Sequence, residues 1–295
     1  MMIRFWGVRG SIPFPGPKSV RYGGNTTCIE VRNSQDDLII LDGGTGIFPL
    51  AQTLLGKLPV RCHIFITHTH WDHIQGLPFF IPLFIPGCRV DIYGAFDPIN
   101  LRDIRDILSR QMEYCYFPVR EVELKAEIRY HTLREGECVQ VGTTKITNML
   151  MNHPVLNFGY KLEEEGKSVF FSGDHEWPYN IYDPTDDGFD EYEQLIVQQR
   201  ANMIDFIRGM DALIMDSAYT EKEYPSKKGW GHGTLDSSIL VAKEAQVKNL
   251  FLTHHEPTRS DDLLEQLFQE TVARYQFPPD SPKLHLAYEG LTFQV

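Results

Sequence analysis

One stretch of the chain constrains its architecture most strongly, and it reads Thr67-His68-Thr69-His70-Trp71-Asp72-His73. It follows His63–Ile66, an apolar run of the length that is typical of a buried strand. His68 and His70 are two residues apart and can share one face of an extended segment, whereas Asp72 and His73 need a turn and can then face a second ion. Mixed imidazole and carboxylate donors favour Zn²⁺, with Mn²⁺ and Fe as alternatives. The stretch therefore predicts a metal site at the end of a strand.

Four protein ligands are too few for two cations, so other strand ends must contribute donors. Three polar residues directly follow patterns that predict strands: His153, Asp174 and His254. A carboxylate such as Asp174 can bridge two cations through its two oxygens. We therefore expect these three side chains to complete the metal site.

Composition limits the function classes that need to be considered. The formal net charge is −12, from 28 basic and 40 acidic residues, and this argues against a general nucleic-acid or anionic-membrane binder. The five cysteines form no C-x-x-C pair and are odd in number, which favours a reduced, cytoplasmic compartment. The most apolar run, Leu77–Cys88, is twelve residues long with three prolines, too short for a membrane span, and we recognise no targeting segment.

Short apolar runs with β-branched residues predict strands in two groups, with helical patterns between some of them. The expected strands cover 2–5, 27–31, 38–41, 63–67 and 90–93, and then 145–149, 158–162, 168–172, 212–216, 250–253 and 284–287. The expected helices cover 97–112, 191–207, 234–245 and 260–275. This order predicts two packed sheets with helices outside, or one mixed sheet. Because no linker rich in Gly, Ser or Pro interrupts the chain, we expect one domain over 1–295. An acidic, aromatic insertion is expected at about 179–210.

At this point the sequence resembles the metallo-β-lactamase fold superfamily, and within it the phosphodiesterase branch that includes tRNase Z and cyclic-nucleotide phosphodiesterases. The matching pieces extend from GVRGSIP near the N-terminus to LTHHEP at Leu252–Pro257, and the others are YGGNTTC, LDGGTG, THTHWDH, FSGDHE and GWGHGT. The resemblance implies a four-layer αββα sandwich of two mixed sheets, with two divalent metal ions at one edge.

The resemblance also implies a role for individual residues. One cation would bind His68, His70 and His153, and the second would bind Asp72, His73 and His254, with Asp174 bridging. His254 is preferred to His255 because neighbours in an extended segment point to opposite faces, unless the turn begins earlier. His232 in GWGHGT would approach the scissile phosphate. Ligating histidines usually need a partner behind them, so Asp42 in LDGGTG is expected either to orient a metal ligand from behind or to be a turn residue before a glycine-rich bend.

The implied mechanism is attack by a hydroxide held between the two cations, with Asp72 relaying a proton and His232 donating one. We expect a phosphodiesterase acting on a cyclic or other small nucleotide. The alternatives are a tRNA 3′-end endoribonuclease, a hydrolase of esters, thioesters or lactams, and a non-catalytic metal-binding regulatory module.

The expected partner is a small phosphodiester or nucleotide rather than extended nucleic acid or a membrane, and a homodimer is a further expectation. Five aromatic residues are candidates for stacking on a base: Trp71, Phe79, Phe80, Tyr219 and Trp230. The roles of His175 and Glu176, which depart from the SGDT form common in tRNase Z, stay open.

Overall fold

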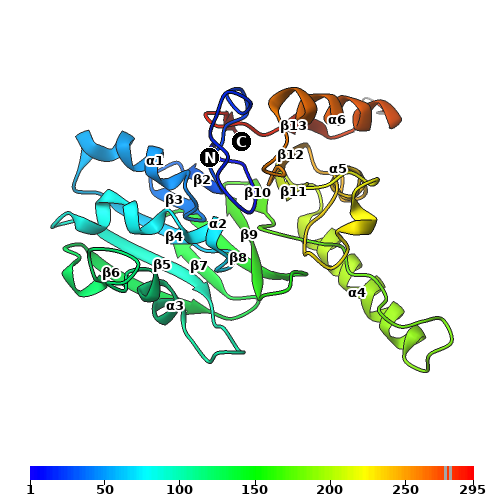
Figure 1. Cartoon of the computed structure of the whole chain (residues 1–295), viewed down its shortest axis with the longest axis horizontal. Helices are drawn as coiled ribbons and strands as arrows, with labels where there is room; N and C mark the ends of the chain where they lie inside the picture. Colours follow the sequence, from blue (N-terminus) through cyan, green and yellow to red (C-terminus); the bar gives the residue numbers. More distant parts are fainter. Residues whose placement is uncertain (276–277, 279–280) are drawn as a thin grey trace.

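The computed structural model describes residues 1–275, 278 and 281–295. Within these residues the chain forms two seven-stranded sheets with helices on the outside (Figure 1). The predicted αββα sandwich of two mixed sheets is confirmed.

The first sheet has the strand order β14-β1-β2-β3-β4-β5-β6. Its strands are β1 (Met2–Gly7), β2 (Cys28–Arg32), β3 (Leu38–Leu41), β4 (Arg61–Phe65), β5 (Arg89–Ala95), β6 (Glu127–Leu133) and β14 (Thr292–Gln294). Pairing is antiparallel from β14 to β3 and parallel from β3 to β6.

The second sheet has the order β13-β12-β11-β10-β9-β8-β7. Its strands are β7 (Cys138–Val141), β8 (Thr144–Met151), β9 (Asn157–Glu164), β10 (Lys167–Phe171), β11 (Ala212–Asp216), β12 (Asn249–Thr253) and β13 (Lys283–Leu286). Pairing is antiparallel from β7 to β10 and parallel from β10 to β13.

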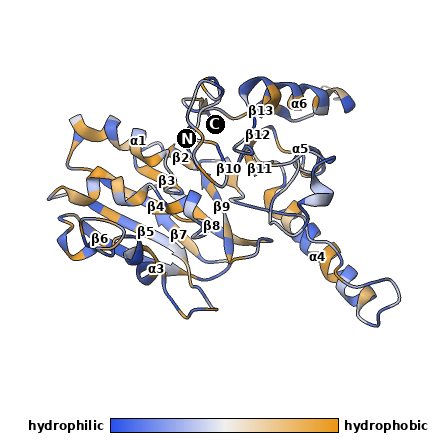
Figure 2. Cartoon of the chain, viewed as in Figure 1, coloured by the Kyte–Doolittle hydropathy of each residue, from blue (hydrophilic) through white to orange (hydrophobic). Residues whose placement is uncertain are grey.

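The main core lies between the two sheets, where alternate side chains of each strand meet, among them Phe5, Phe65, Tyr160, Phe171 and Phe251. The outer face of the first sheet packs against α1 (Ile47–Leu54) and α3 (Ile104–Gln111). The outer face of the second packs against α4 (Phe189–Ile207), α5 (Leu235–Glu244) and α6 (Asp261–Arg274). Figure 2 shows hydrophobic residues alternating with hydrophilic ones along the helices.

Strand direction brings polar residues from distant parts of the sequence to one edge of the sandwich. β4, β10 and β12 lie in the parallel parts of their sheets, and β8 is parallel to β10 because each is antiparallel to β9. The residues that follow the carboxyl ends of these strands therefore meet at one edge.

The helix expected over 97–112 begins later than predicted. It starts at Ile104, with Asp103 as the N-cap whose side chain accepts the Asp106 N–H at 2.8 Å. Asp97 instead accepts the N–H groups of Ile99 and Asn100 at 2.9 and 3.2 Å. An aspartate that caps its own turn competes with helix formation, and this is why the Asp97-Pro98 signal was wrong.

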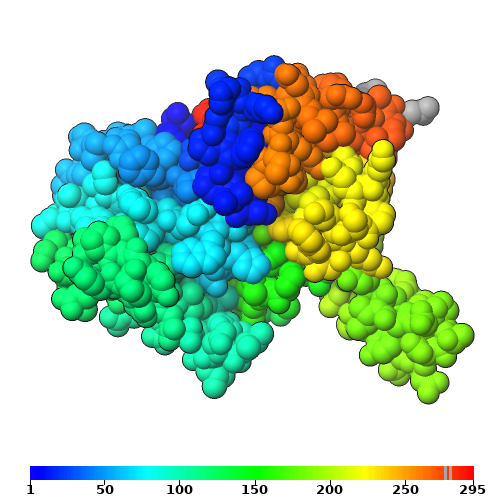
Figure 3. Space-filling model, in the orientation of Figure 1, coloured from blue at the N-terminus to red at the C-terminus, as the bar shows by residue number. Residues whose placement is uncertain are grey.

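The segment predicted as an insertion contains α4, whose buried residues, Met203, Ile204 and Ile207, lie in its last turns. The earlier part of the helix and the loop before it project from the body (Figures 1 and 3). In the described part of the chain, we find no helix with the length and apolar character that a membrane span requires.

Candidate metal centre

The first group of donors consists of His68, His70, His153 and Asp174, whose ligand atoms all lie within 4.8 Å of one another. His68 and His70 follow β4, His153 follows β8 and Asp174 follows β10. His68 Nε2 lies 3.4 Å from Asp174 Oδ2, and His153 Nε2 lies 3.1 Å from His70 Nδ1. The structure thus brings together the four residues expected around one cation.

The second group consists of Asp72, His73, Asp174 and His254. The short helix α2 (Trp71–Ile74) turns the chain directly after His70, so that Asp72 and His73 face back toward the strand ends. Asp72 Oδ2 lies 3.3 Å from His73 Nε2 and 3.2 Å from His254 Nε2. This group unites the residues expected around the second cation.

Asp174 belongs to both groups and points one oxygen at each. Its Oδ2 faces His68, while its Oδ1 lies 3.2 Å from His73 Nε2 and 3.1 Å from His254 Nε2. Two donors bound to one tetrahedral zinc ion at about 2.0–2.1 Å lie about 3.3 Å apart, so these spacings suit ligands that share a cation.

Unpaired buried atoms give a second test of whether cations fit. Among the described residues His68 Nε2, His73 Nε2 and Asp174 Oδ1 are buried without a hydrogen-bond partner. Buried polar atoms are rarely left unpaired, and all three are aimed into the donor groups. The residues present therefore fit divalent cations.

Asp42 lies behind the donors and orients them. Its carboxylate accepts the Thr67 N–H at 2.7 Å, the Thr67 hydroxyl at 2.9 Å and His73 Nδ1–H at 2.7 Å. This leaves His73 Nε2 unprotonated and free to bind a cation once the ring is neutral. Of the two roles expected for Asp42, these contacts are those of a residue that orients a ligating histidine.

The loop after β1 packs against the second group of donors. The Ser11 N–H donates to Asp72 Oδ2 at 2.7 Å. Gly10 packs against the His254 ring so closely that a Cβ there would lie 2.1 Å from a ring carbon. Only glycine permits this contact between the N-terminal loop and the donors.

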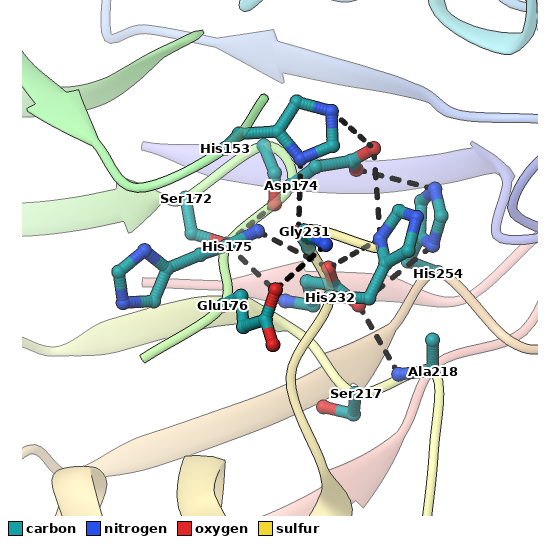
Figure 4. Close-up of polar contacts among 12 residues, drawn as sticks. His153, Ser172, Asp174, His175, Glu176, Ser217, Ala218, Gly231, His232 and His254 are labelled. Carbon is teal, nitrogen blue, oxygen red and sulfur yellow. Dashed lines mark hydrogen bonds and ion pairs between the residues drawn. The ribbon is translucent and has the colours of Figure 1, made fainter. Parts of the chain in front are cut away.

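His232 lies beside the donor groups and is held by a carboxylate of its own. Its Nδ1 donates to Asp216 Oδ2 at 2.9 Å and lies 3.7 Å from Asp174 Oδ2, and its ring stacks on His254 with centroids 4.6 Å apart (Figure 4). Burial alone would lower the pKa of His232, but Asp216 and Asp174 outweigh it and raise the pKa above its ordinary value. His232 can therefore act as a proton donor.

The donors differ in charge state according to their surroundings. Burial lowers the pKa of His68 well below its ordinary value and that of His153 to about 4, so both rings are neutral and ready to bind a metal. Burial would raise the pKa of Asp174, yet the surrounding imidazoles, led by His254 and His73, hold it well below its ordinary value.

Comparison with known protein families shows the family of this chain. Residues 39–255 match the family described as the beta-lactamase superfamily domain. The chain belongs to this superfamily.

Similar proteins agree with that assignment. Ribonuclease Z of Agathobacter rectalis is 22% identical over 96% of this chain and 97% of its own length. Among solved structures, the short form of human tRNase Z superposes with a TM-score of 0.62 at 20% identity, covering 100% of this chain and 99% of that chain. A diphosphatase of the PhnP family gives 0.64 at 19% identity (100% and 97%), and unliganded yeast PDE1 gives 0.60 at 17% (99% and 98%).

The likenesses to solved structures support the fold. The superfamily fold implies divalent metals, and the chain carries the His and Asp groups that could hold them. The prediction of a metal-dependent hydrolase is confirmed at the level of class by the family match and the curated relatives.

His254 and His255 point in different directions. His254 faces Asp72 and Asp174, while His255 Nε2–H donates to the Ala287 carbonyl at 2.8 Å, away from the donors. The segment is not extended, however, because His254 has φ 57°. The prediction selected the residue that faces the donors, although its premise of extended backbone was wrong.

A cavity of about 430 Å³ opens beside His68 and His153. Most of its wall comes from two segments, 95–100 from the last residue of β5 onward and 150–156 around the end of β8, and the rest comes from His68, Thr69 and Ile107. None of the five aromatic residues expected to line a pocket is among its lining residues in the described part of the chain. Phe80, for example, is fully buried in the core, and Trp71 is mostly exposed.

Two residues that contribute to the site were missed by sequence reasoning. Asp216 ends β11 and pairs with His232, so the rule that identified Asp174 and His254, a polar residue at a strand end, could have found it. Glu176 was left without a role, and no local pattern connects it with its partners about 50 residues later. Its contacts exist only in the folded chain.

Proposed function

We propose that the chain is a metal-dependent phosphodiesterase that hydrolyses a cyclic or other small nucleotide at two cations. The observation that carries the proposal is the position of Asp174. Each of its two carboxylate oxygens faces histidines of one donor group, and His232 Nδ1 lies 3.7 Å from its Oδ2. When bound, two cations supply an activated water and stabilise the charge that develops on the attacking and leaving oxygens.

Within this proposal His68, His70 and His153 would hold one cation, Asp72, His73 and His254 would hold the other, and Asp174 could contribute to both. Zinc is favoured by the mixture of imidazole and carboxylate donors, with manganese and iron as alternatives.

Two residues of the chain move protons. Asp72, oriented by the Ser11 N–H, accepts a proton from the attacking water. His232 donates to Asp216 through Nδ1, which leaves its Nε2 to protonate the leaving oxygen. Asp216 fixes the ring orientation and favours the charged imidazole, as a carboxylate partner does in other catalytic histidines.

The cavity beside His68 supports a small substrate. Its volume of about 430 Å³ falls within the range of small-molecule sites, about 300–1,000 Å³. The described residues that line it include no lysine or arginine. The lining includes one carboxylate, Asp97, which accepts the Ile99 and Asn100 N–H groups. The cavity therefore suits an uncharged group such as a base or sugar, while the phosphoryl charge would be met by the cations.

Processing of tRNA 3′ ends is the second candidate, favoured by the ribonuclease Z relatives. Charge argues against it, because residues 179–210 contain seven acidic and two basic residues in a chain of net charge −12. Extended RNA rewards a basic surface. Hydrolysis of carbon esters, thioesters or lactams would not require His232, and a non-catalytic module would not require the complete donor set.

We further propose a cytoplasmic location, on the grounds of the odd number of cysteines.

The proposal is tested by assaying the metal-loaded protein with bis-p-nitrophenyl phosphate, 3′,5′-cyclic AMP and GMP, a precursor tRNA and p-nitrophenyl acetate. We expect turnover of the diester and of a cyclic nucleotide, loss of turnover with a chelator, and a fall in kcat of about 10²–10⁴-fold in His232→Ala. His131→Ala is the matched control. His131 also pairs with a carboxylate, Asp91 at 3.0 Å, but this pair lies on the first sheet and outside the donor groups.

Cleavage of the precursor tRNA with no turnover of cyclic nucleotides would move the function to the second candidate. Turnover of the acetate alone would reject phosphodiester chemistry.

A further inference from the structure

Glu176 lies two residues after Asp174, and its carboxylate binds a single distant segment. It is 3% exposed and accepts the Gly229 N–H at 2.8 Å, the Gly231 N–H at 2.8 Å and the Tyr224 hydroxyl at 2.7 Å. These donors lie on residues 224–232, the segment that ends at His232, and Figure 4 shows Glu176 beside Gly231.

The same segment contacts the donor groups directly. His153 Nδ1 donates to the Gly231 carbonyl at 2.9 Å, which directs His153 Nε2 toward His70 and Asp174. A Cβ on Gly231 would lie 2.2 Å from His153 Nδ1, so the backbone passes as close to the ring as it can. A shift of this segment would therefore displace two functional histidines at once, His232 and His153.

The end of the segment is less rigid than its beginning. Tyr224–Ser226 form a short 3₁₀ helix, and the Trp230 N–H donates to the Lys227 carbonyl at 3.0 Å. Gly229 and Gly231 have φ 86° and 87°, values that glycine adopts without strain but at a high cost in conformational entropy. The bonds to Glu176 act on these two glycines, and bonds to a carboxylate are roughly twice as strong as those between neutral groups.

Glu176 is itself firmly placed. Its N–H donates to the Asn152 carbonyl at 3.0 Å, and Asn152 Nδ2 donates to the Glu176 carbonyl at 2.8 Å. The residue thus connects three parts of the site: the turn with Asp174, the end of β8 with His153, and the segment with His232.

We propose that Glu176 is a positioning residue for the hydrolytic reaction: it holds 224–232 so that His232 faces the reacting group and the Gly231 carbonyl orients His153. The kinetic part rests on the proposed function, while the ordering of the segment can be measured without it.

The test compares Glu176→Gln with Glu164→Gln. The amide is nearly isosteric with the carboxylate, but its NH₂ cannot accept a backbone N–H. Glu164 is the matched control, since it is also buried and accepts hydrogen bonds from a distant loop residue, Ser34. It lies at the opposite end of β9 from the site, about 23 Å along the strand.

Three quantities are measured for both variants: amide hydrogen exchange of 224–232 in the metal-free protein, melting temperature, and kcat and KM for bis-p-nitrophenyl phosphate at saturating metal. For Glu176→Gln we expect exchange at Gly229 and Gly231 to quicken at least about tenfold, and kcat to fall about 10- to 100-fold with KM within about threefold. Glu164→Gln should lower the melting temperature with kcat unchanged.

Unchanged exchange in 224–232, or a kcat equal to that of the wild type, would overturn the proposal. An equal loss of kcat in Glu164→Gln would mean that only general stability is involved, and would overturn it as well. If Glu176→Gln does not fold, Tyr224→Phe removes one of the bonds and should quicken exchange in the same segment by a smaller factor; no change there would also count against the proposal.

Failure of the proposed function is distinguishable, because it would abolish turnover in the wild type and leave the exchange result standing.

Discussion

Replacing Asp42 by asparagine should weaken one of the two proposed metal sites more than the other. Asp42 Oδ2 accepts from His73 Nδ1–H and from the Thr67 hydroxyl, while Oδ1 accepts the Thr67 N–H. In the variant the remaining oxygen can keep the Thr67 N–H, and the NH₂ then faces His73. Two donors cannot pair, so the neutral ring must move its proton to Nε2, the atom that faces Asp72 and Asp174.

The size of the effect follows from the bond that is lost. A hydrogen bond to a charged group contributes about 1.5–3 kcal/mol. Because about 1.4 kcal/mol corresponds to a tenfold change in affinity, the loss is about 10- to 100-fold. The same range is typical of substitutions behind a ligating histidine. The cation bound by His73 should be affected most, because Asp42 reaches the other group only through Thr67, whose hydroxyl lies 3.1 Å from His68 Nδ1.

The assay is a competition titration of Zn²⁺ against a chelator with the metal-free protein. Asp91→Asn is the matched control, because this buried carboxylate also accepts from a histidine, His131, but on β5 outside the donor groups. The reasoning is refuted if Asp42→Asn binds both equivalents as tightly as the wild type, or if Asp91→Asn loses affinity to the same extent.

Two further predictions concern stability and substrate binding. Burial lowers the pKa of His255 to about 3, whereas a histidine in the unfolded chain has a pKa near 6.5. Between these two values the unfolded state binds a proton that the folded state does not. The free energy of unfolding is therefore highest above about pH 6.5 and falls as the pH decreases toward 3. Denaturant unfolding of the metal-free protein should accordingly show a loss between pH 7 and pH 5 that His255→Gln reduces by about 2 kcal/mol, and an equal loss in both proteins would count against this. Ile99 lines the cavity beside His68 and is mostly exposed, so Ile99→Asp should leave the melting temperature unchanged. The substitution should raise KM for a cyclic nucleotide about tenfold, because it removes an apolar contact and repels the phosphate. An unchanged KM in steady-state kinetics would show that the substrate lies elsewhere.

The parts of the structure that the sequence predicts are those set by local patterns. Buried strands such as β4 and β10 carry continuous apolar runs, and the polar residues that follow them mark one edge of the sheets. This is why the seven expected metal donors could be named before their geometry was known, although their role as ligands stays a proposal.

Three strands escaped prediction, β6, β7 and β14, and all three lie at sheet edges. Their residues are largely half-buried or exposed, as in Glu127–Leu133, so no apolar run distinguishes them from loops.

Contacts between distant segments also escaped prediction. The cavity walls come from a loop after β5 and the end of β8, and the partners of Glu176 lie on a glycine-containing loop that has no pattern of its own.

The central claim is that two cations at these donor groups drive phosphodiester hydrolysis, and it is tested most directly by measuring turnover of bis-p-nitrophenyl phosphate as Zn²⁺ is added to the metal-free protein. The account predicts no turnover without metal and a rate that reaches its maximum at two bound equivalents per chain. Turnover in the metal-free protein, or none with two equivalents bound, would contradict it.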